Sequence, residues 1–158
     1  MRYLILICIT IFAVSCNQPK LPYFGRTEYN PETKDSVHHT VEEFAFVNQN
    51  NDIVDLNYLK GKTTIVNFFF TSCPSICPIM VNELSRLQKE VDGKYNIQIL
   101  SHTVDPKRDS IGRLNEFINK KNINTENWDF VTGEKQDLYR LARKSFFILK
   151  PAETINAG

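Results

Sequence analysis

The sequence predicts an α/β domain with a largely parallel central sheet. Apolar runs typical of strands alternate with amphipathic helical segments, in the order strand, helix, strand, helix, strand, helix. Parallel strands need such crossover helices, which connect them in a right-handed sense. Of the 158 residues, 42% are hydrophobic and 23% are charged, which permits a core of ordinary size. The formal net charge of +1 gives no indication of nucleic-acid binding.

The first central strand is predicted at 63–70, where the run TTIVNFFF is almost continuously β-branched or aromatic. Such a run is typical of a strand that is covered on both faces. A helix follows, with Pro78 in its first turn, where the missing N–H costs nothing. Its apolar side chains recur at spacings of four, three and four before Gly93 ends the helix: Met80, Leu84, Leu87 and Val91.

The remaining elements follow the same alternation. Residues 97–104 (IQILSHTV) form the next predicted strand, and Asp109 is predicted to cap the helix after it. Residues 128–133 give a further strand, and 135–144 a further helix. Upstream, a short strand near Phe44 and Phe46 and a second at Ile53-Val54 flank the turn QNNDI, which predicts a hairpin.

The N-terminal segment is predicted to be separate from this domain. Residues 1–15 combine Arg2 with an apolar run too short for a comfortable membrane span, which is typical of a signal peptide. The sequence AVSC around Cys16 resembles a bacterial lipobox, so Cys16 is the predicted lipidation site; the alternative is a plain secretory signal. Residues 16–36 read as an extended linker and 37–158 as the domain. This arrangement predicts a lipid-anchored protein of the bacterial cell envelope, with its domain on the extracytoplasmic (periplasmic) side.

Only two of the four cysteines are expected to be available in the mature domain. Cys8 lies in the predicted signal peptide and Cys16 is taken by lipid, so Cys73 and Cys77 remain in a compartment where disulfides can form. They occupy the turn from the 63–70 strand into the next helix, where a helix N-terminus stabilises a thiolate. Because ligand sites gather at the carboxyl ends of parallel strands, the loop at 105–109 is expected beside them.

The pair has three possible roles. A passive disulfide would close a very short loop and stabilise the fold little. Thioredoxin-type redox sites separate their cysteines by two residues, whereas three stand between Cys73 and Cys77. Two thiolates do not complete a zinc tetrahedron, but two or three soft ligands suffice for Cu(I). Redox chemistry and copper binding therefore both remain open.

The two segments FFFTSCPSICPIM and HTVDPKRDS together resemble the Sco/SenC family, and the resemblance covers roughly residues 37–150. It implies a thioredoxin-like fold of three layers around a mixed sheet, with the last strand and helix missing. It also implies that Cys73 and Cys77 bind copper, as Cu(I) or Cu(II). The protein would then be a copper chaperone for the copper-centre subunit of cytochrome c oxidase rather than an enzyme. A thiol–disulfide oxidoreductase acting on that subunit's cysteines, or in redox defence, is the alternative.

The resemblance further implies the surroundings of the site. Asp105 in the VDP motif would be an acidic neighbour of the cysteines, or would serve only the geometry of its turn. The third copper ligand would be a histidine beyond Gly158, so this sequence is expected to be C-terminally incomplete. His102 lies in the 97–104 strand and is expected to be a packed residue rather than a ligand, although alternation alone leaves its facing open. His38 and His39 are expected at a solvated domain edge.

Overall fold

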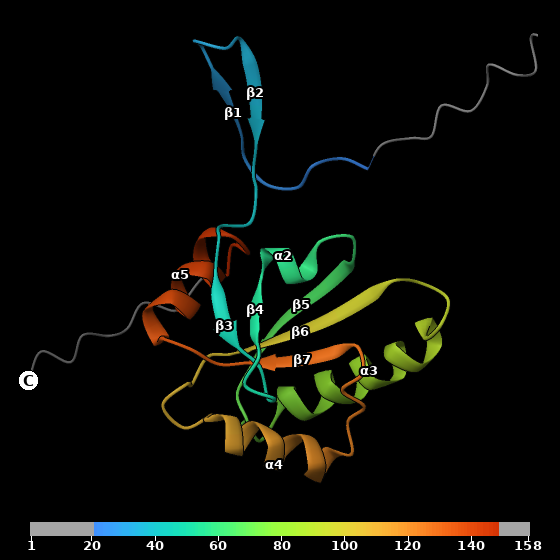
Figure 1. Ribbon diagram of the computed structural model, residues 1–158. Helices are drawn as coiled ribbons and strands as arrows, with labels where there is room; N and C mark the ends of the chain where they lie inside the picture. The colour runs from blue at the N-terminus through green and yellow to red at the C-terminus, as the bar shows by residue number, and fades with distance from the viewer. Residues whose placement is uncertain (1–20, 149–158) are drawn as a thin grey trace, which may run out of the picture. The chain divides into compact units, whose positions relative to one another are not determined.

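The computed structural model describes residues 21–148, and Figure 1 labels their helices and strands. The chain divides between His39 and Thr40 into two units. The predicted signal peptide and Cys16 lie outside the described residues. Among residues 21–148 no helix combines the length and the apolar character needed to cross a membrane.

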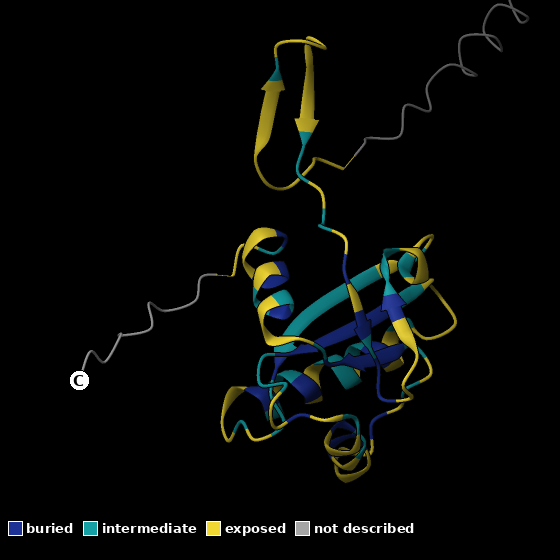
Figure 2. Cartoon of the chain, turned by 60° about the vertical axis from the view of Figure 1, so that its left-hand side comes forward, coloured by how far each residue is buried: buried dark blue, intermediate teal, exposed yellow. Residues whose placement is uncertain are grey.

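The first unit contains a β-hairpin of strands β1 (Thr27–Asn30) and β2 (Asp35–His38). The Asn30 side chain shapes the turn by accepting the backbone N–H of Glu32 at 2.9 Å, and Lys34 adopts a left-handed φ of 54°. The expectation of an extended linker over 16–36 is therefore corrected for its second half. Both strands are mostly exposed, as Figure 2 shows, so their sequences lack the apolar alternation that marks a strand.

The second unit is built on three parallel strands in the order β5 (Thr63–Phe69), β6 (Ile97–Thr103) and β7 (Trp128–Val131). Each begins where the sequence predicts, and the predicted ends are within two residues of those observed. Every residue of β7, and all of β6 except its first, is buried (Figure 2). The predicted coverage on both faces concerned 63–70, and there it holds only in part: β5 is mostly half-buried, and Phe69 is its one buried residue.

A second hairpin makes the sheet mixed. Strands β3 (Ala45–Val47) and β4 (Ile53–Asp55) pair antiparallel, as the sequence predicts. Val47 also pairs antiparallel with Thr132, just past the end of β7, through two backbone hydrogen bonds of 2.9 and 3.1 Å. This bridge joins the hairpin to the β7 side of the parallel strands, so the predicted mixed sheet is confirmed.

Helices cover both faces of the sheet and give three layers (Figure 1). On one face lie α3 (Ile76–Val91) and α4 (Ile111–Lys121), and on the other lie α5 (Lys135–Lys144) and the single turn α2 (Leu56–Leu59). The helices carry their apolar side chains inward because hydrophobic residues recur at helical spacing. The predicted alternation of strands and helices is confirmed.

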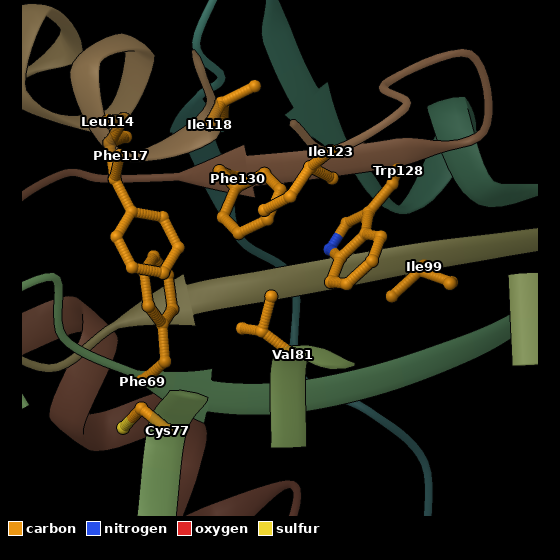
Figure 3. Packing of buried hydrophobic residues seen from close by; sticks show 10 residues of the cluster. All are labelled: Phe69, Cys77, Val81, Ile99, Leu114, Phe117, Ile118, Ile123, Trp128 and Phe130. Carbon is orange, nitrogen blue, oxygen red and sulfur yellow. The ribbon is translucent and has the colours of Figure 1, made fainter. Parts of the chain in front are cut away.

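The core beneath α3 and α4 is rich in aromatic side chains, as Figure 3 shows. The Phe130 ring stacks on Trp128 at 5.1 Å between centroids and meets the Phe69 ring edge-on at 5.3 Å. Each such ring contributes roughly 1.5–3 kcal/mol by leaving water. Cys77 belongs to this cluster and lies next to Phe69 at the carboxyl end of β5 (Figure 3), so the core itself positions one of the two thiols.

Candidate metal centre

The two cysteines occupy the loop between β5 and α3 and the first turn of α3. Cys77 is the second residue of α3 and is buried, whereas Cys73 is half-buried in the loop, and both thiols are free. The loop turns sharply because the Cys73 N–H donates to the Phe70 carbonyl at 3.2 Å. Pro78 fits the first turn of the helix, as predicted, because a proline there gives up no helical hydrogen bond.

The thiols differ in acidity although they are hydrogen-bonded to each other. The pKa of Cys73 is lowered to about 7, first because the Cys77 thiol donates to its sulfur and then because the backbone N–H groups of Ser75 and Cys77 do so. The pKa of Cys77 is raised, chiefly because burial penalises its charged form. Cys73 is therefore the thiol that ionises first as the pH rises toward neutral, and the Cys77 thiol is its hydrogen-bond donor.

A buried aspartate ties this loop to the neighbouring strand. The carboxylate of Asp109 accepts the backbone N–H of Thr71 at 3.1 Å, the Thr71 hydroxyl at 2.5 Å and the Thr103 hydroxyl at 2.5 Å. Thr71 stands two residues before Cys73, and Thr103 is the last residue of β6. The charge of Asp109 also adds to burial in raising the pKa of Cys77. Asp109 is thus part of the site's framework.

The predicted capping role of Asp109 is wrong. Ser110 is the N-cap of α4, and its hydroxyl accepts the Arg113 N–H at 3.4 Å. Aspartate and serine both favour caps, so the local sequence offered two adjacent candidates. The signal that distinguishes them is non-local, since the threonines that bind Asp109 stand at or just past the ends of two adjacent parallel strands.

Asp105 has the contacts of a turn residue. Its N–H donates to the Thr103 hydroxyl at 3.0 Å, and its carbonyl accepts the N–H groups of Arg108 and Asp109 at 3.0 and 2.9 Å. Its carboxylate lies 3.6 Å from the Arg108 guanidinium in a half-exposed ion pair. These contacts shape the loop that delivers Asp109 to the thiol loop.

His102 lies on the opposite face of the sheet from the cysteine loop. Its ring is fully buried among aromatic rings, neither nitrogen has a hydrogen-bond partner within residues 21–148, and burial lowers its pKa to about 3. His102 pairs in register with Phe68, and their rings stack on the face of the sheet that α5 covers. The next residue of β5, Phe69, packs with Cys77 on the other face. The expectation that His102 is a packed residue agrees with this placement; the surrounding rings are those of Phe44, Phe46, Phe68 and Phe146.

The other two histidines belong to the first unit. The His38 ring stacks on Tyr23 at 4.0 Å and lies 3.3 Å from the Thr27 hydroxyl, so it is half-buried rather than fully solvated. His39 is likewise half-buried. Across residues 21–148 no group of three or more histidine, cysteine or acidic side chains is arranged to hold a metal ion. The described donor set is therefore the thiol pair; the expected third ligand and Cys16 lie outside it.

Comparison with known proteins shows which family the chain is similar to. The SCO1/SenC family profile matches residues 32–156. The SCO1 protein homolog of Bacillus subtilis is 37% identical over 117 residues, which cover 73% of this chain and 61% of the relative. The chain thus spans less than two thirds of the length of that relative.

Solved structures of Sco proteins are also similar to this chain. BsSco, described as a member of the Sco family of cytochrome c oxidase assembly proteins with a disulfide switch, is 35% identical with a TM-score of 0.66, over 71% of this chain and 67% of that one. Yeast Sco1 with copper bound is 25% identical with a TM-score of 0.59, over 66% and 65% of the two chains. These similarities confirm the thioredoxin-like fold. The chain belongs to the SCO1/SenC family.

Proposed function

We propose that this protein is a copper chaperone whose Cys73 and Cys77 bind copper as cargo. The observation that carries the proposal is the thiol pair itself: two adjacent sulfurs, hydrogen-bonded to each other, one with its pKa lowered to about 7. Metal binding requires thiolates, so a pair that loses its first proton near neutral pH is poised for it.

Copper suits this donor set better than zinc does. Thiolates are soft ligands, and Cu(I) accepts two or three of them, whereas a structural zinc site needs four ligands. Yeast Sco1, which shares the fold, has been solved with copper bound. The family resemblance adds a histidine ligand beyond Gly158, which would complete a three-coordinate site for Cu(I) or support Cu(II).

The client is proposed to be the copper-centre subunit of cytochrome c oxidase. BsSco is described as belonging to a family of cytochrome c oxidase assembly proteins, which supports this choice. Lipidation of Cys16 would anchor the protein to a membrane on the extracytoplasmic side of the cell envelope without a spanning helix. The chaperone would then face an oxidase subunit exposed on the same side.

Titration of the reduced protein with Cu(I) against a chromophoric chelator tests the proposal. We expect one Cu(I) per chain, no binding by Cys73→Ser/Cys77→Ser, and no binding after oxidation of the pair to a disulfide. Failure of the reduced protein to compete with chelators of graded affinity would sink the chaperone function.

A thiol–disulfide oxidoreductase is the second candidate, and the unequal acidity of the pair favours it. An attacking thiolate at Cys73 and a buried resolving thiol at Cys77 are what exchange chemistry needs. The disulfide switch identified in BsSco points the same way. Catalytic turnover of a protein disulfide by the metal-free protein, with an external dithiol as reductant, would establish this function whatever the copper affinity.

A further inference from the structure

A groove of about 260 Å³ opens beside Cys73. One wall belongs to the cysteine loop and the first turn of α3, and the other belongs to α4. The principal lining residues are Cys73, Pro78, Arg113, Phe117, Lys120 and Lys121. The less buried of the two thiols therefore shares a cavity with a cluster of cations.

The α4 wall has a positive balance. Arg113 pairs with Glu116, the wall's one carboxylate, at 2.8 Å, and both side chains are at least half exposed. Lys120 and Lys121 are exposed and form no ion pair within the described part of the chain. The groove thus keeps two uncompensated ammonium groups, whose field acts on any charged group that approaches Cys73.

The other residues that line the groove add no free negative charge to balance these cations. Thr71 also lines the groove, but its hydroxyl already donates to Asp109 at 2.5 Å, and that buried carboxylate accepts three hydrogen bonds. Phe117 is 8% exposed and gives the groove an apolar floor. The groups left for a ligand are therefore the ammonium groups, the phenyl floor and the thiol.

We propose that this groove recognises an acidic segment flanking the reactive cysteine of a partner protein. The inference rests on the proposed function and deepens it, because a client whose thiol meets Cys73 brings its neighbouring residues to the mouth of the groove that Cys73 lines. A protein is favoured over an anionic lipid headgroup since the cations share their groove with a thiol, which a lipid does not use. Electrostatic complementarity of this kind raises association rates and selects partners.

The chemistry of contact is thiol–disulfide exchange. The Cys73 thiolate attacks a partner disulfide, forms a mixed disulfide with one partner sulfur and releases the other as a thiolate. The Cys77 thiol then loses its proton to solvent and attacks the Cys73 sulfur, which releases the second partner thiolate. Two electrons pass from the protein dithiol to the partner disulfide, and the protein ends as the Cys73–Cys77 disulfide.

Three synthetic peptides test the proposal with the full chain. Each carries one cysteine as its 2-thiopyridyl disulfide, flanked by two aspartates, two serines or two lysines, and released 2-thiopyridone reports the rate of attack. At low ionic strength we expect the reduced protein to react about 3- to 10-fold faster with the aspartate peptide than with the lysine peptide. Lys120→Gln/Lys121→Gln should bring this ratio close to one and leave the serine-peptide rate unchanged.

A matched double variant supplies the control. Lys89 and Lys94 are also exposed, and Lys89 stands twelve residues beyond Cys77 in α3, about 18 Å along the helix. Lys89→Gln/Lys94→Gln removes the same charge and should keep the wild-type ratio. The proposal is overturned if both double variants lose the aspartate-to-lysine rate ratio equally, or if Lys120→Gln/Lys121→Gln slows the reaction with all three peptides equally. It is also overturned if that variant keeps the peptide ratio but no longer binds vesicles of anionic phospholipid that the wild type binds. Thermal unfolding of both variants shows that each is folded.

Copper titration separates this inference from the proposed function. We expect Lys120→Gln/Lys121→Gln to bind Cu(I) as the wild type does, since neither lysine is a soft ligand. A wild type that prefers the aspartate peptide yet binds no copper would refute the chaperone and leave the groove's selectivity established.

Discussion

Two cysteines four positions apart behave as different chemical groups because their surroundings differ. Cys73 receives hydrogen bonds that stabilise its thiolate, so its pKa is lowered to about 7, while burial raises the pKa of Cys77. At neutral pH about half of the Cys73 population is ionised. The first attack on a disulfide, or the first bond to a soft metal, is therefore expected at Cys73.

Cys77→Ala tests this dependence directly. The change removes the donor that lowers the Cys73 pKa most, so that pKa should rise from about 7 toward its ordinary 9.0, and alkylation at pH 7 should slow by about threefold or more. Thiolate absorbance and iodoacetamide rates measured from pH 5 to 10 give the value. In Cys73→Ala, the remaining thiol should be almost unreactive at pH 7. An unchanged titration of Cys73 would contradict the assignment.

Asp109→Asn keeps the shape of the buried side chain and removes its charge. The amide can no longer accept all three donors from Thr71 and Thr103, so the free energy of unfolding should fall by about 1–3 kcal/mol. Loss of the negative charge should also move the Cys77 pKa down toward its ordinary value. Urea unfolding and thiol titration measure the two effects.

Asp105→Asn is the matched control for that variant. Its carboxylate belongs to a half-exposed ion pair at 3.6 Å, so we expect a change within about 0.5 kcal/mol. Equal destabilisation by the two variants would show that Asp109 is no more than another loop carboxylate.

At the scale of the element, α3 links the core to the reactive loop. Val81, one turn after Cys77, is 1% exposed against Phe69 and Phe130, whereas Ile79 on the same helix is 60% exposed. The helix therefore has one face that fixes the thiol and one that meets solvent.

Two truncations on α3 separate these faces. Val81→Ala leaves a cavity under the helix and should lower the free energy of unfolding by about 1–2.5 kcal/mol. Ile79→Ala removes more atoms, but from an exposed site, and should change it by no more than about 0.5 kcal/mol. Chemical denaturation of both proteins provides the comparison, and a larger loss at Ile79 would refute the packing described for this helix.

The central elements were predictable because their signals are local. The run at 63–70 and the apolar stripe from Met80 to Val91 specify a central strand and an amphipathic helix without reference to the rest of the chain. The hairpin at 27–38 was missed because its strands are polar and its turn depends on one asparagine side chain. Asp109 was misassigned because its partners stand 6 and 38 residues away and meet it only in the folded sheet.

For the whole molecule, sheet topology predicted more of the site than residue type did. Parallel strands end at one edge, so the cysteine loop after β5 and the VDP loop after β6 were expected together, and Asp109 joins them. The facing of His102 could not be predicted in this way. In a strand buried on both faces, alternation divides residues into two sets without saying which set faces which helices.

The Asp109 hydrogen bonds also have an evolutionary consequence. One carboxylate accepts a backbone N–H and two hydroxyls, so positions 71, 103 and 109 are expected to change together in evolution, although 38 positions separate the outermost two. An apolar residue at 109 alone would leave the buried Thr103 hydroxyl and the half-buried Thr71 hydroxyl without their acceptor. An apolar residue at 71 or 103 alone would leave the carboxylate short of donors. Descendants that abandon the aspartate are therefore expected to abandon both threonines with it.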